Sequence, residues 1–204
     1  MSYKITDMVY VAEKALSDEL CDTLVKEFHQ HPWYIRDGIC GDGELNSMCP
    51  VTNADEPVTK LSTDITVMVK DCHSKNIETL TNTLFEHAQN YLQEFAHFEI
   101  GNPPITFDPA FNMQWYKPGE GFFAWHAEKS PYYNERALAW MFNLNDVEEG
   151  GGTEFKYFPN AKINARKGQL TIFPAYISHL HRGIVAPKED KYIATGWFSY
   201  ERPN

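Results

Sequence analysis

The stretch FNMQWYKPGEGFFAWHAE, residues 111–128, decides the fold class that the sequence predicts. Its first six residues alternate between two faces of an extended strand, one carrying Phe111, Met113 and Trp115 and the other Asn112, Gln114 and Tyr116. A Pro-Gly turn and an aromatic run follow, and this run ends on His126 and Glu128. Alternation followed by turn residues is typical of an antiparallel β-sheet and not of a helix.

The rest of the second half also consists of short β-rich runs bounded by Gly, Pro or Asn. These runs are RALAWMFNLN (136–145), GTEFKYF (152–158), GQLTIF (168–173), HRGIV (181–185) and KYIATGWFSY (191–200). Many short strands at such spacing predict an antiparallel sandwich or barrel.

The first half predicts two amphipathic helices. Ser17 precedes two acidic residues, which is typical of a helix start, and apolar residues then recur at helical spacing until Pro32. A longer helix is expected from Asn76 to Phe98, after a strand at 63–69. We expect both helices to cover the outer face of one sheet.

The segment from Trp33 to Lys60 is rich in Gly, Asp, Asn and Pro, which predicts a long mobile loop. We therefore expect one domain over residues 1–204. Within it, residues 1–100 form a helical flank and the mobile loop, and residues 101–204 form the β-core.

The composition narrows the classes of partner. The net charge of −10 disfavours binding to nucleic acid or to anionic membranes. No run reaches the roughly 18 apolar residues that a membrane span needs, and the N-terminus lacks the pattern of a signal peptide. These observations predict a soluble, cytoplasmic protein, and they leave the oligomeric state open.

The four cysteines are Cys21, Cys40, Cys49 and Cys72, and none belongs to a C-x-x-C pair. Zinc-finger spacing is therefore absent, and free thiols in a reducing compartment are expected. Cys40 and Cys49 lie in the Gly-rich loop, so a bridge between them on oxidation is the alternative.

His126 and Glu128 are the first candidates for metal ligands. On a strand, residues two apart point to the same side, so both side chains would project together toward one ion. By itself such a pair often occurs by chance on a surface. His29 and His31 form a competing pair, but they lie at a predicted helix end, where histidines commonly interact with the helix dipole.

The third ligand is expected in FPAYISHLHRGIVAPKEDKYIATGWF, residues 173–198, which contains His179 and His181. Two histidines and one carboxylate form the facial triad of non-haem Fe(II) oxygenases. Lys191 then opens a strand and shares a face with Ile193, Thr195 and Trp197. A cation there could bind the far carboxylate of a dicarboxylic co-substrate.

Several ordered motifs carry a family resemblance over residues 111–200. YKPGEGFFAWHAE places the histidine ten residues after Tyr116, RALAWMFNLNDVEEGGGTEF begins with an arginine-led strand, and His181-x-Gly precedes the KYIATGW segment. In these motifs the chain resembles the iron(II)/2-oxoglutarate-dependent oxygenases of the prolyl 4-hydroxylase-like branch. It resembles in particular the small members carried by marine phages and cyanobacteria, which implies a phage-encoded protein in a host cytoplasm.

The resemblance implies an α+β, mainly β fold: a double-stranded β-helix (jelly roll, cupin-like) with N-terminal helices packed on one sheet. It also implies Fe(II) held by His126, Glu128 and His181, with His181 rather than His179 as the distal ligand. 2-Oxoglutarate would chelate the iron, and O2 would take the last position.

The resemblance assigns further residues to the co-substrate. Lys191 would pair with the C5 carboxylate of 2-oxoglutarate, helped by Thr195 and Tyr116. Trp197 and Met141 would supply apolar walls, although ordinary core packing explains both residues equally well.

Two positions depart from the family pattern. Glu128 stands where the usual ligand is Asp, and Asn143 stands where relatives often have a tyrosine that hydrogen-bonds 2-oxoglutarate. The amide of Asn143 can still donate to a carboxylate, but with a shorter reach. Because the chain keeps a carboxylate ligand, unlike the halogenase relatives, hydroxylation is expected rather than halogenation.

The predicted function is a dioxygenase (EC 1.14.11.-) that hydroxylates a C–H bond, of a prolyl or other peptide residue, while 2-oxoglutarate becomes succinate. The substrate class remains open between peptide, protein and small molecule. Residues 33–60 and 129–135 would flank the metal and set specificity. The alternatives are a weak or inactive metal-binding jelly-roll module, a cupin-like metal enzyme that does not use 2-oxoglutarate, and a purely structural jelly roll.

Overall fold

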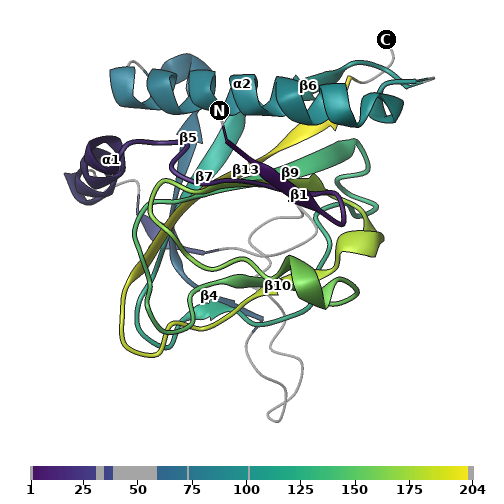
Figure 1. Cartoon of the computed structure of the whole chain (residues 1–204). Helices are drawn as coiled ribbons and strands as arrows, with labels where there is room; N and C mark the ends of the chain where they lie inside the picture. The colour runs from purple at the N-terminus through teal and green to yellow at the C-terminus, as the bar shows by residue number, and fades with distance from the viewer. Residues whose placement is uncertain (1, 31–34, 39–58, 73, 101, 202–204) are drawn as a thin grey trace.

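An antiparallel sheet of nine strands forms the centre of the structure (Figure 1), a computed structural model that describes residues 2–30, 35–38, 59–72, 74–100 and 102–201. Its strand order is β1 (Lys4–Thr6), β2 (Val9–Ala12), β11 (Leu170–Pro174), β9 (Arg136–Asn143), β13 (Lys191–Tyr200), β7 (Ala110–Tyr116), β5 (Thr63–Met68) and β3 (Arg36–Asp37). The short strand β6 (Ile105–Phe107) pairs with the end of β13.

Two short strand pairs lie on the other side of this sheet from the helices (Figure 1). They are β10 (Thr153–Phe155) with β12 (His181–Gly183), and β4 (Lys60–Leu61) with β8 (Gly121–Phe122). The two layers form the expected mainly β jelly roll, so the predicted fold class is confirmed.

Two helices, α1 (Asp18–Gln30) and α2 (Lys75–Glu94), cover the outer face of the large sheet (Figure 1). The hydroxyl of Ser17 accepts a hydrogen bond of 3.2 Å from the Leu20 amide, as expected for a capping residue. The second helix was predicted to reach Phe98, but the α-helix ends at Glu94 and a 3₁₀ turn, Ala96–Phe98, follows it. Further 3₁₀ turns are Val69–Asp71, Pro159–Ala161 and Ile177–His179.

Strand β7 divides its side chains between the two layers, as its alternation predicts. Phe111 and Met113 are buried in the core that α1 and α2 share with the sheet. Gln114 and Tyr116 are buried on the opposite face and line an internal cavity. The helices thus seal one face of the sheet and leave the other to form the functional site.

The sequence prediction missed one hairpin and was wrong about one further segment. The hairpin of β1 and β2 was not predicted, because its two-residue turn consists of Asp7 and Met8, both with positive φ (51° and 61°), and lacks the usual glycine. His126 and Glu128 were expected to share a strand, but residues 123–130 contain only an isolated bridge between His126 and His181.

Some predictions concern parts of the chain that the structure does not describe. Most of the predicted loop at 33–60 lies outside the described residues, as do Cys40, Cys49 and His31. Cys21 and Cys72 are described and are free thiols. None of the helices in the described part of the chain has the length and apolar character that a membrane crossing requires.

Candidate metal centre

A cavity of about 130 Å³ lies between the large sheet and the two short strand pairs. It is lined by nearly all of the residues that the sequence predicts for the site: Tyr116, His126, Glu128, Met141, His181, Lys191, Thr195 and Trp197. Asn143 is the predicted site residue that does not line this cavity.

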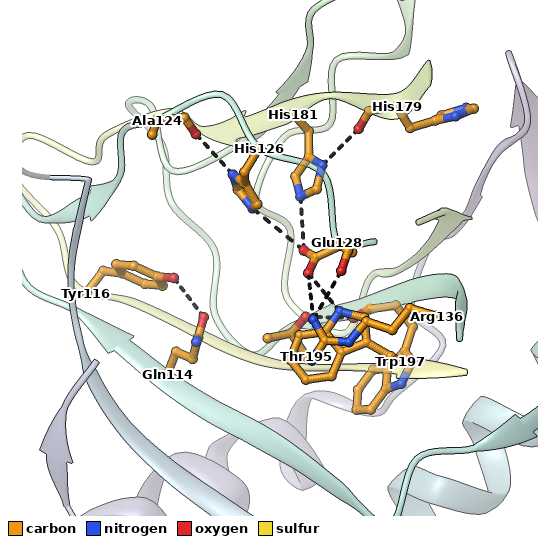
Figure 2. Close-up of polar contacts among 11 residues, drawn as sticks. Gln114, Tyr116, Ala124, His126, Glu128, Arg136, His179, His181, Thr195 and Trp197 are labelled. Atoms are coloured by element: carbon orange, nitrogen blue, oxygen red, sulfur yellow. Dashed lines mark hydrogen bonds and ion pairs between the residues drawn. The ribbon is translucent and has the colours of Figure 1, made fainter. Parts of the chain in front are cut away.

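His126, Glu128 and His181 form a cluster at one end of the cavity (Figure 2). Oε1 of Glu128 lies 3.6 Å from Nε2 of His126 and 3.3 Å from Nε2 of His181. One ligand atom from each residue lies within 4.8 Å of the others, which is close enough for all three to hold one metal ion. Among the described residues this is the group of three with such an arrangement.

The backbone brings the two histidines together. The amide of His126 donates to the carbonyl of His181, and the amide of His181 donates to the carbonyl of His126, both over 3.0 Å. This reciprocal pair joins an irregular segment to the start of β12. A tertiary contact therefore brings the two histidines together. His126 and Glu128, in contrast, were expected to share a strand, but both lie on the irregular segment.

The tautomer of each imidazole follows from its second nitrogen (Figure 2). Nδ1 of His126 lies 3.0 Å from the carbonyl oxygen of Ala124, and Nδ1 of His181 lies 3.0 Å from that of His179. A carbonyl oxygen only accepts, so each Nδ1 carries the hydrogen. Each Nε2 then directs a lone pair toward the cluster, which is the form that binds a metal.

The electrostatics of the cluster favour an anionic carboxylate. Burial alone would raise the pKa of Glu128. Without a metal, however, each imidazole can also carry a hydrogen on Nε2, and the hydrogen bonds and charges of His126 and His181 in that form outweigh burial and hold the pKa of Glu128 well below its usual range. Burial lowers the pKa of His181, with the neighbouring His126 acting in the same direction. Two neutral imidazoles and one carboxylate are donors that suit Fe(II).

Glu128 is held by partners on its far side (Figure 2). Its Oε2 accepts a hydrogen bond of 2.7 Å from Nε1 of Trp197. Arg136 lies 3.8 Å from the same oxygen and donates to the backbone carbonyl of Glu128 over 3.2 Å. The guanidinium of Arg136 is itself stacked between Tyr133 and Trp197, at 3.8 and 3.5 Å from the ring centroids.

Arg136 was not predicted as a site residue, and Trp197 was predicted only as an apolar wall. One feature pointed to Arg136: it is the cation at the start of the otherwise apolar run RALAWMF. Its contact with Glu128 depends on how an irregular segment folds over β9, which no local pattern encodes.

The competing histidines lie elsewhere. His179 turns away from the cluster, with Nε2 at 2.9 Å from the backbone oxygen of Asp7 and Nδ1 at 3.0 Å from the Ser178 hydroxyl. His29 lies at the end of α1 and contacts the hydroxyl of Tyr192 over 2.9 Å. Among these histidines, the structure brings only His126 and His181 to Glu128.

Lys191 lies in the same cavity and is 7% exposed. Its ammonium sits over the ring of Tyr116, 5.6 Å from the centroid, and it has no hydrogen bond or ion pair with any residue that the structure describes. Burial lowers its pKa to about 8. Taking an unpaired ammonium out of water costs several kcal/mol, so the cavity suits an anionic ligand at this point.

The surface alternative for Lys191 is a pair with Glu189 or Asp190. Those carboxylates have other partners instead: Glu189 accepts from the Glu148 amide over 2.8 Å, and Asp190 accepts from Nε1 of Trp115 over 2.8 Å. The buried Lys60 offers a contrast, since its ammonium lies 2.7 Å from Asp64.

The remaining predicted co-substrate residues already have hydrogen-bond partners. The hydroxyl of Thr195 donates to the Trp140 carbonyl over 2.8 Å, and that of Tyr116 donates to Oε1 of Gln114 over 2.7 Å. Asn143 is 1% exposed, and its amide donates to Gln169 over 3.2 Å.

Comparison with known proteins agrees with this geometry. Residues 111–199 match the sequence model of the 2OG-Fe(II) oxygenase superfamily, and this range contains the whole cluster and Lys191. No curated protein sequence matches the chain.

Solved prolyl hydroxylases share the fold. A viral collagen prolyl hydroxylase from Paramecium Bursaria Chlorella virus-1, solved with 2-oxoglutarate, has a TM-score of 0.66 at 18% identity, covering 96% of this chain and 97% of its own. A Pseudomonas putida prolyl-4-hydroxylase gives 0.68 at 11% identity, covering 97% and 95%. A Trichoplax adhaerens prolyl hydroxylase bound to a hypoxia inducible factor peptide gives 0.70 at 15% identity, covering 96% and 84%. The sequence match thus covers the part of the chain that holds the cluster and Lys191, and the chain shares its fold with these prolyl hydroxylases.

Proposed function

We propose that the chain is an Fe(II)- and 2-oxoglutarate-dependent dioxygenase that hydroxylates a C–H bond of a peptide or protein substrate. The observation that carries this proposal is a His-Glu-His cluster in the same buried cavity as Lys191, whose ammonium has no carboxylate partner among the described residues. We also propose one oxygenase domain over residues 1–204, because one hydrophobic core joins α1 and α2 to the strands of the second half.

We assign the metal to His126, Glu128 and His181. Two imidazoles and one carboxylate leave further positions of the ion open, as Fe(II) oxygenases require. When bound, Fe(II) and 2-oxoglutarate supply the oxidative chemistry, in which 2-oxoglutarate is decarboxylated to succinate and one atom of O2 enters the substrate. The neutral histidines bind through Nε2, and Glu128 supplies the negative charge that partly balances the ion.

We assign the C5 carboxylate of 2-oxoglutarate to Lys191. A compact ammonium suits a single carboxylate, and the pairing removes the cost of the buried charge. The ammonium also lies over the ring of Tyr116, 5.6 Å from its centroid, where a cation–π interaction stabilises it. Thr195, Trp197 and Met141 contribute cavity wall, which keeps water from the reacting atoms.

Asn143 receives no co-substrate contact in this proposal. Its side chain is buried outside the cavity lining and is bonded to Gln169.

A peptide substrate is supported by the relatives in fold. One of them is a collagen prolyl hydroxylase, and another is bound to a peptide fragment. We propose a prolyl or other peptide residue as the site of hydroxylation. Residues 129–135 adjoin Glu128 and carry Tyr132, which is 53% exposed, so we assign this segment to substrate contact.

The test is a turnover assay. The protein is loaded with Fe(II) under nitrogen, given 2-oxoglutarate and air, and succinate is measured with and without proline-containing peptides. We expect succinate in the wild type, in larger amounts with a cognate peptide, and none in His181→Ala. Binding of metal and 2-oxoglutarate without any succinate would contradict the proposal and favour a binding module.

A further inference from the structure

A line of buried polar side chains crosses three neighbouring strands of the large sheet. Asp64 on β5 is the cross-strand partner of Gln114 on β7, and Tyr116 on β7 is the partner of Lys191 on β13. Gln114 and Tyr116 are two residues apart and share the cavity face of β7. The line therefore leads from a buried carboxylate to the proposed co-substrate lysine.

The direction of each hydrogen bond in this line is set at its Asp64 end. The carboxylate of Asp64 accepts from Nζ of Lys60 over 2.7 Å, from the hydroxyl of Ser62 over 2.8 Å and from Nε2 of Gln114 over 3.0 Å. A carboxylate that is paired with an ammonium only accepts. The amide of Gln114 must therefore turn its NH2 group toward Asp64.

The orientation of Gln114 decides what Tyr116 does. With its NH2 group on Asp64, Gln114 presents Oε1 to the hydroxyl of Tyr116, 2.7 Å away (Figure 2). An amide oxygen only accepts, so Tyr116 donates its hydrogen to Gln114. The Tyr116 oxygen then has only lone pairs left for the cavity, and burial keeps this hydroxyl protonated by raising its pKa well above the usual value.

The charged residues along this line are Lys60, Asp64 and Lys191, and their net positive charge lies on Lys191. Lys60 and Asp64 are both buried and neutralise each other. The hydroxyl of Thr195, on β13, also lines the cavity, and it donates its hydrogen to the backbone oxygen of Trp140. A carboxylate that enters this part of the cavity therefore meets the ammonium of Lys191, and neither hydroxyl has a hydrogen to give it.

We propose that Gln114, oriented by Asp64, is a positioning residue: it holds the hydroxyl hydrogen of Tyr116 away from the cavity, so that the co-substrate carboxylate is recognised by Lys191 and not by the tyrosine. This inference rests on the proposed function. It assigns a role to the buried side chains of Gln114 and Asp64, to which the proposed function assigns none.

The experiment measures how far 2-oxoglutarate binding depends on the Tyr116 hydroxyl. 2-Oxoglutarate is titrated under nitrogen into Mn(II)-loaded wild type, Tyr116→Phe, Gln114→Leu and the double variant. We expect Tyr116→Phe to change the Kd of the wild type by less than about twofold. Gln114→Leu frees the hydroxyl to donate to the carboxylate, and a hydrogen bond to a charged group of this kind tightens binding by roughly tenfold.

In the Gln114→Leu background, removing the Tyr116 hydroxyl should then cost about that same factor. A merely structural role of Gln114 would weaken binding and would not create a dependence on the tyrosine. A loss of tenfold on Tyr116→Phe in the wild-type background, or an equal loss in both backgrounds, overturns the inference.

Two further measurements keep the outcome clear. If Gln114→Leu does not fold, Lys60→Met with Asp64→Asn removes both charges, frees the amide of Gln114 to flip, and should create the same dependence on Tyr116. Wild-type protein that binds Mn(II) but no 2-oxoglutarate overturns the proposed function, and this inference with it. Wild-type protein that binds 2-oxoglutarate with no coupling between Gln114 and Tyr116 overturns the inference alone.

Discussion

Nε1 of Trp197 donates a hydrogen bond of 2.7 Å to Oε2 of Glu128, the carboxylate oxygen that faces away from the two histidines. The other oxygen, Oε1, is the one that lies within 3.6 Å of both Nε2 atoms. A glutamate has one more rotatable bond than an aspartate, so its carboxylate needs a restraint to stay in one place. Trp197 supplies that restraint and leaves one oxygen for a metal.

The first prediction follows from this restraint. Trp197→Phe keeps an aromatic side chain but removes the indole N–H, and we expect it to weaken Mn(II) binding by about 10-fold or more, as losses of outer hydrogen bonds at metal sites do. The affinity is measured by titration calorimetry. In a Glu128→Asp background the shorter carboxylate cannot reach both Trp197 and the histidines, so the same change should cost much less. An equal loss in both backgrounds would show that the indole does not restrain the longer side chain.

The second prediction separates the two neighbouring histidines. His181→Ala should abolish metal binding, because it removes one of three ligand atoms. His179→Ala should keep most of the binding, because its imidazole contacts Asp7 and Ser178 instead. It should lower the free energy of unfolding by about 1–3 kcal/mol, the usual cost of leaving a buried partner unsatisfied. Chemical denaturation and metal titration of both variants check this pair, and the reverse pattern would make His179 the ligand.

The third prediction concerns pH and 2-oxoglutarate. The ammonium of Lys191 has a pKa of about 8, so a growing fraction is neutral above that pH and cannot pair with the carboxylate. We expect the affinity for 2-oxoglutarate to fall as pH rises from 8 to 10, by up to about tenfold per pH unit. Lys191→Arg keeps its charge over this range and should lose the pH dependence. An unchanged profile in Lys191→Arg would mean that another group controls binding.

The fourth prediction concerns stability without ligand. Burial places the folded pKa of Lys191 below its usual value of 10.5, so between about pH 8 and 10.5 the unfolded chain binds a proton that the folded protein does not. The buried ammonium therefore destabilises the folded protein fully below pH 8. This destabilisation disappears as the pH rises from about 8 to 10.5. Lys191→Met should raise the free energy of unfolding at pH 7 by about 3 kcal/mol. Chemical denaturation at pH 7 and pH 10 should show that the extra stability of Lys191→Met is smaller at pH 10. If the extra stability were the same at both pH values, the buried charge would not be its cause.

Local pattern was enough to predict much of the fold. The strands at 111–116 and 191–200 follow from alternation, because one face packs under the helices and the other lines the cavity. The turn at Asp7 and Met8 has no such pattern, since its positive φ values are imposed by the hairpin that it closes. For this reason the first two strands could not be predicted.

The site was predictable in its residue types and less so in its contacts. The His-x-Glu pair and the distance from His181 to Lys191 along the chain are visible in the sequence, and the structure brings these residues to one cavity. The bonds of Glu128 to Trp197, and of Gln114 to Asp64, join residues far apart in the chain. They depend on strand register and on an irregular segment, so they appear only in three dimensions.

The reciprocal backbone hydrogen bonds between His126 and His181 have a consequence for metal exchange. In small zinc domains the ion itself orders the chain, so losing the metal means unfolding. Here the two segments are closed on each other by their own amides, and the carbonyls of Ala124 and His179 aim both imidazoles. An arriving ion finds its ligands already assembled, and a departing ion leaves the fold intact. Stripping the metal with a chelator should therefore be a reversible change of occupancy that leaves the amide hydrogens of His126 and His181 protected from exchange with solvent.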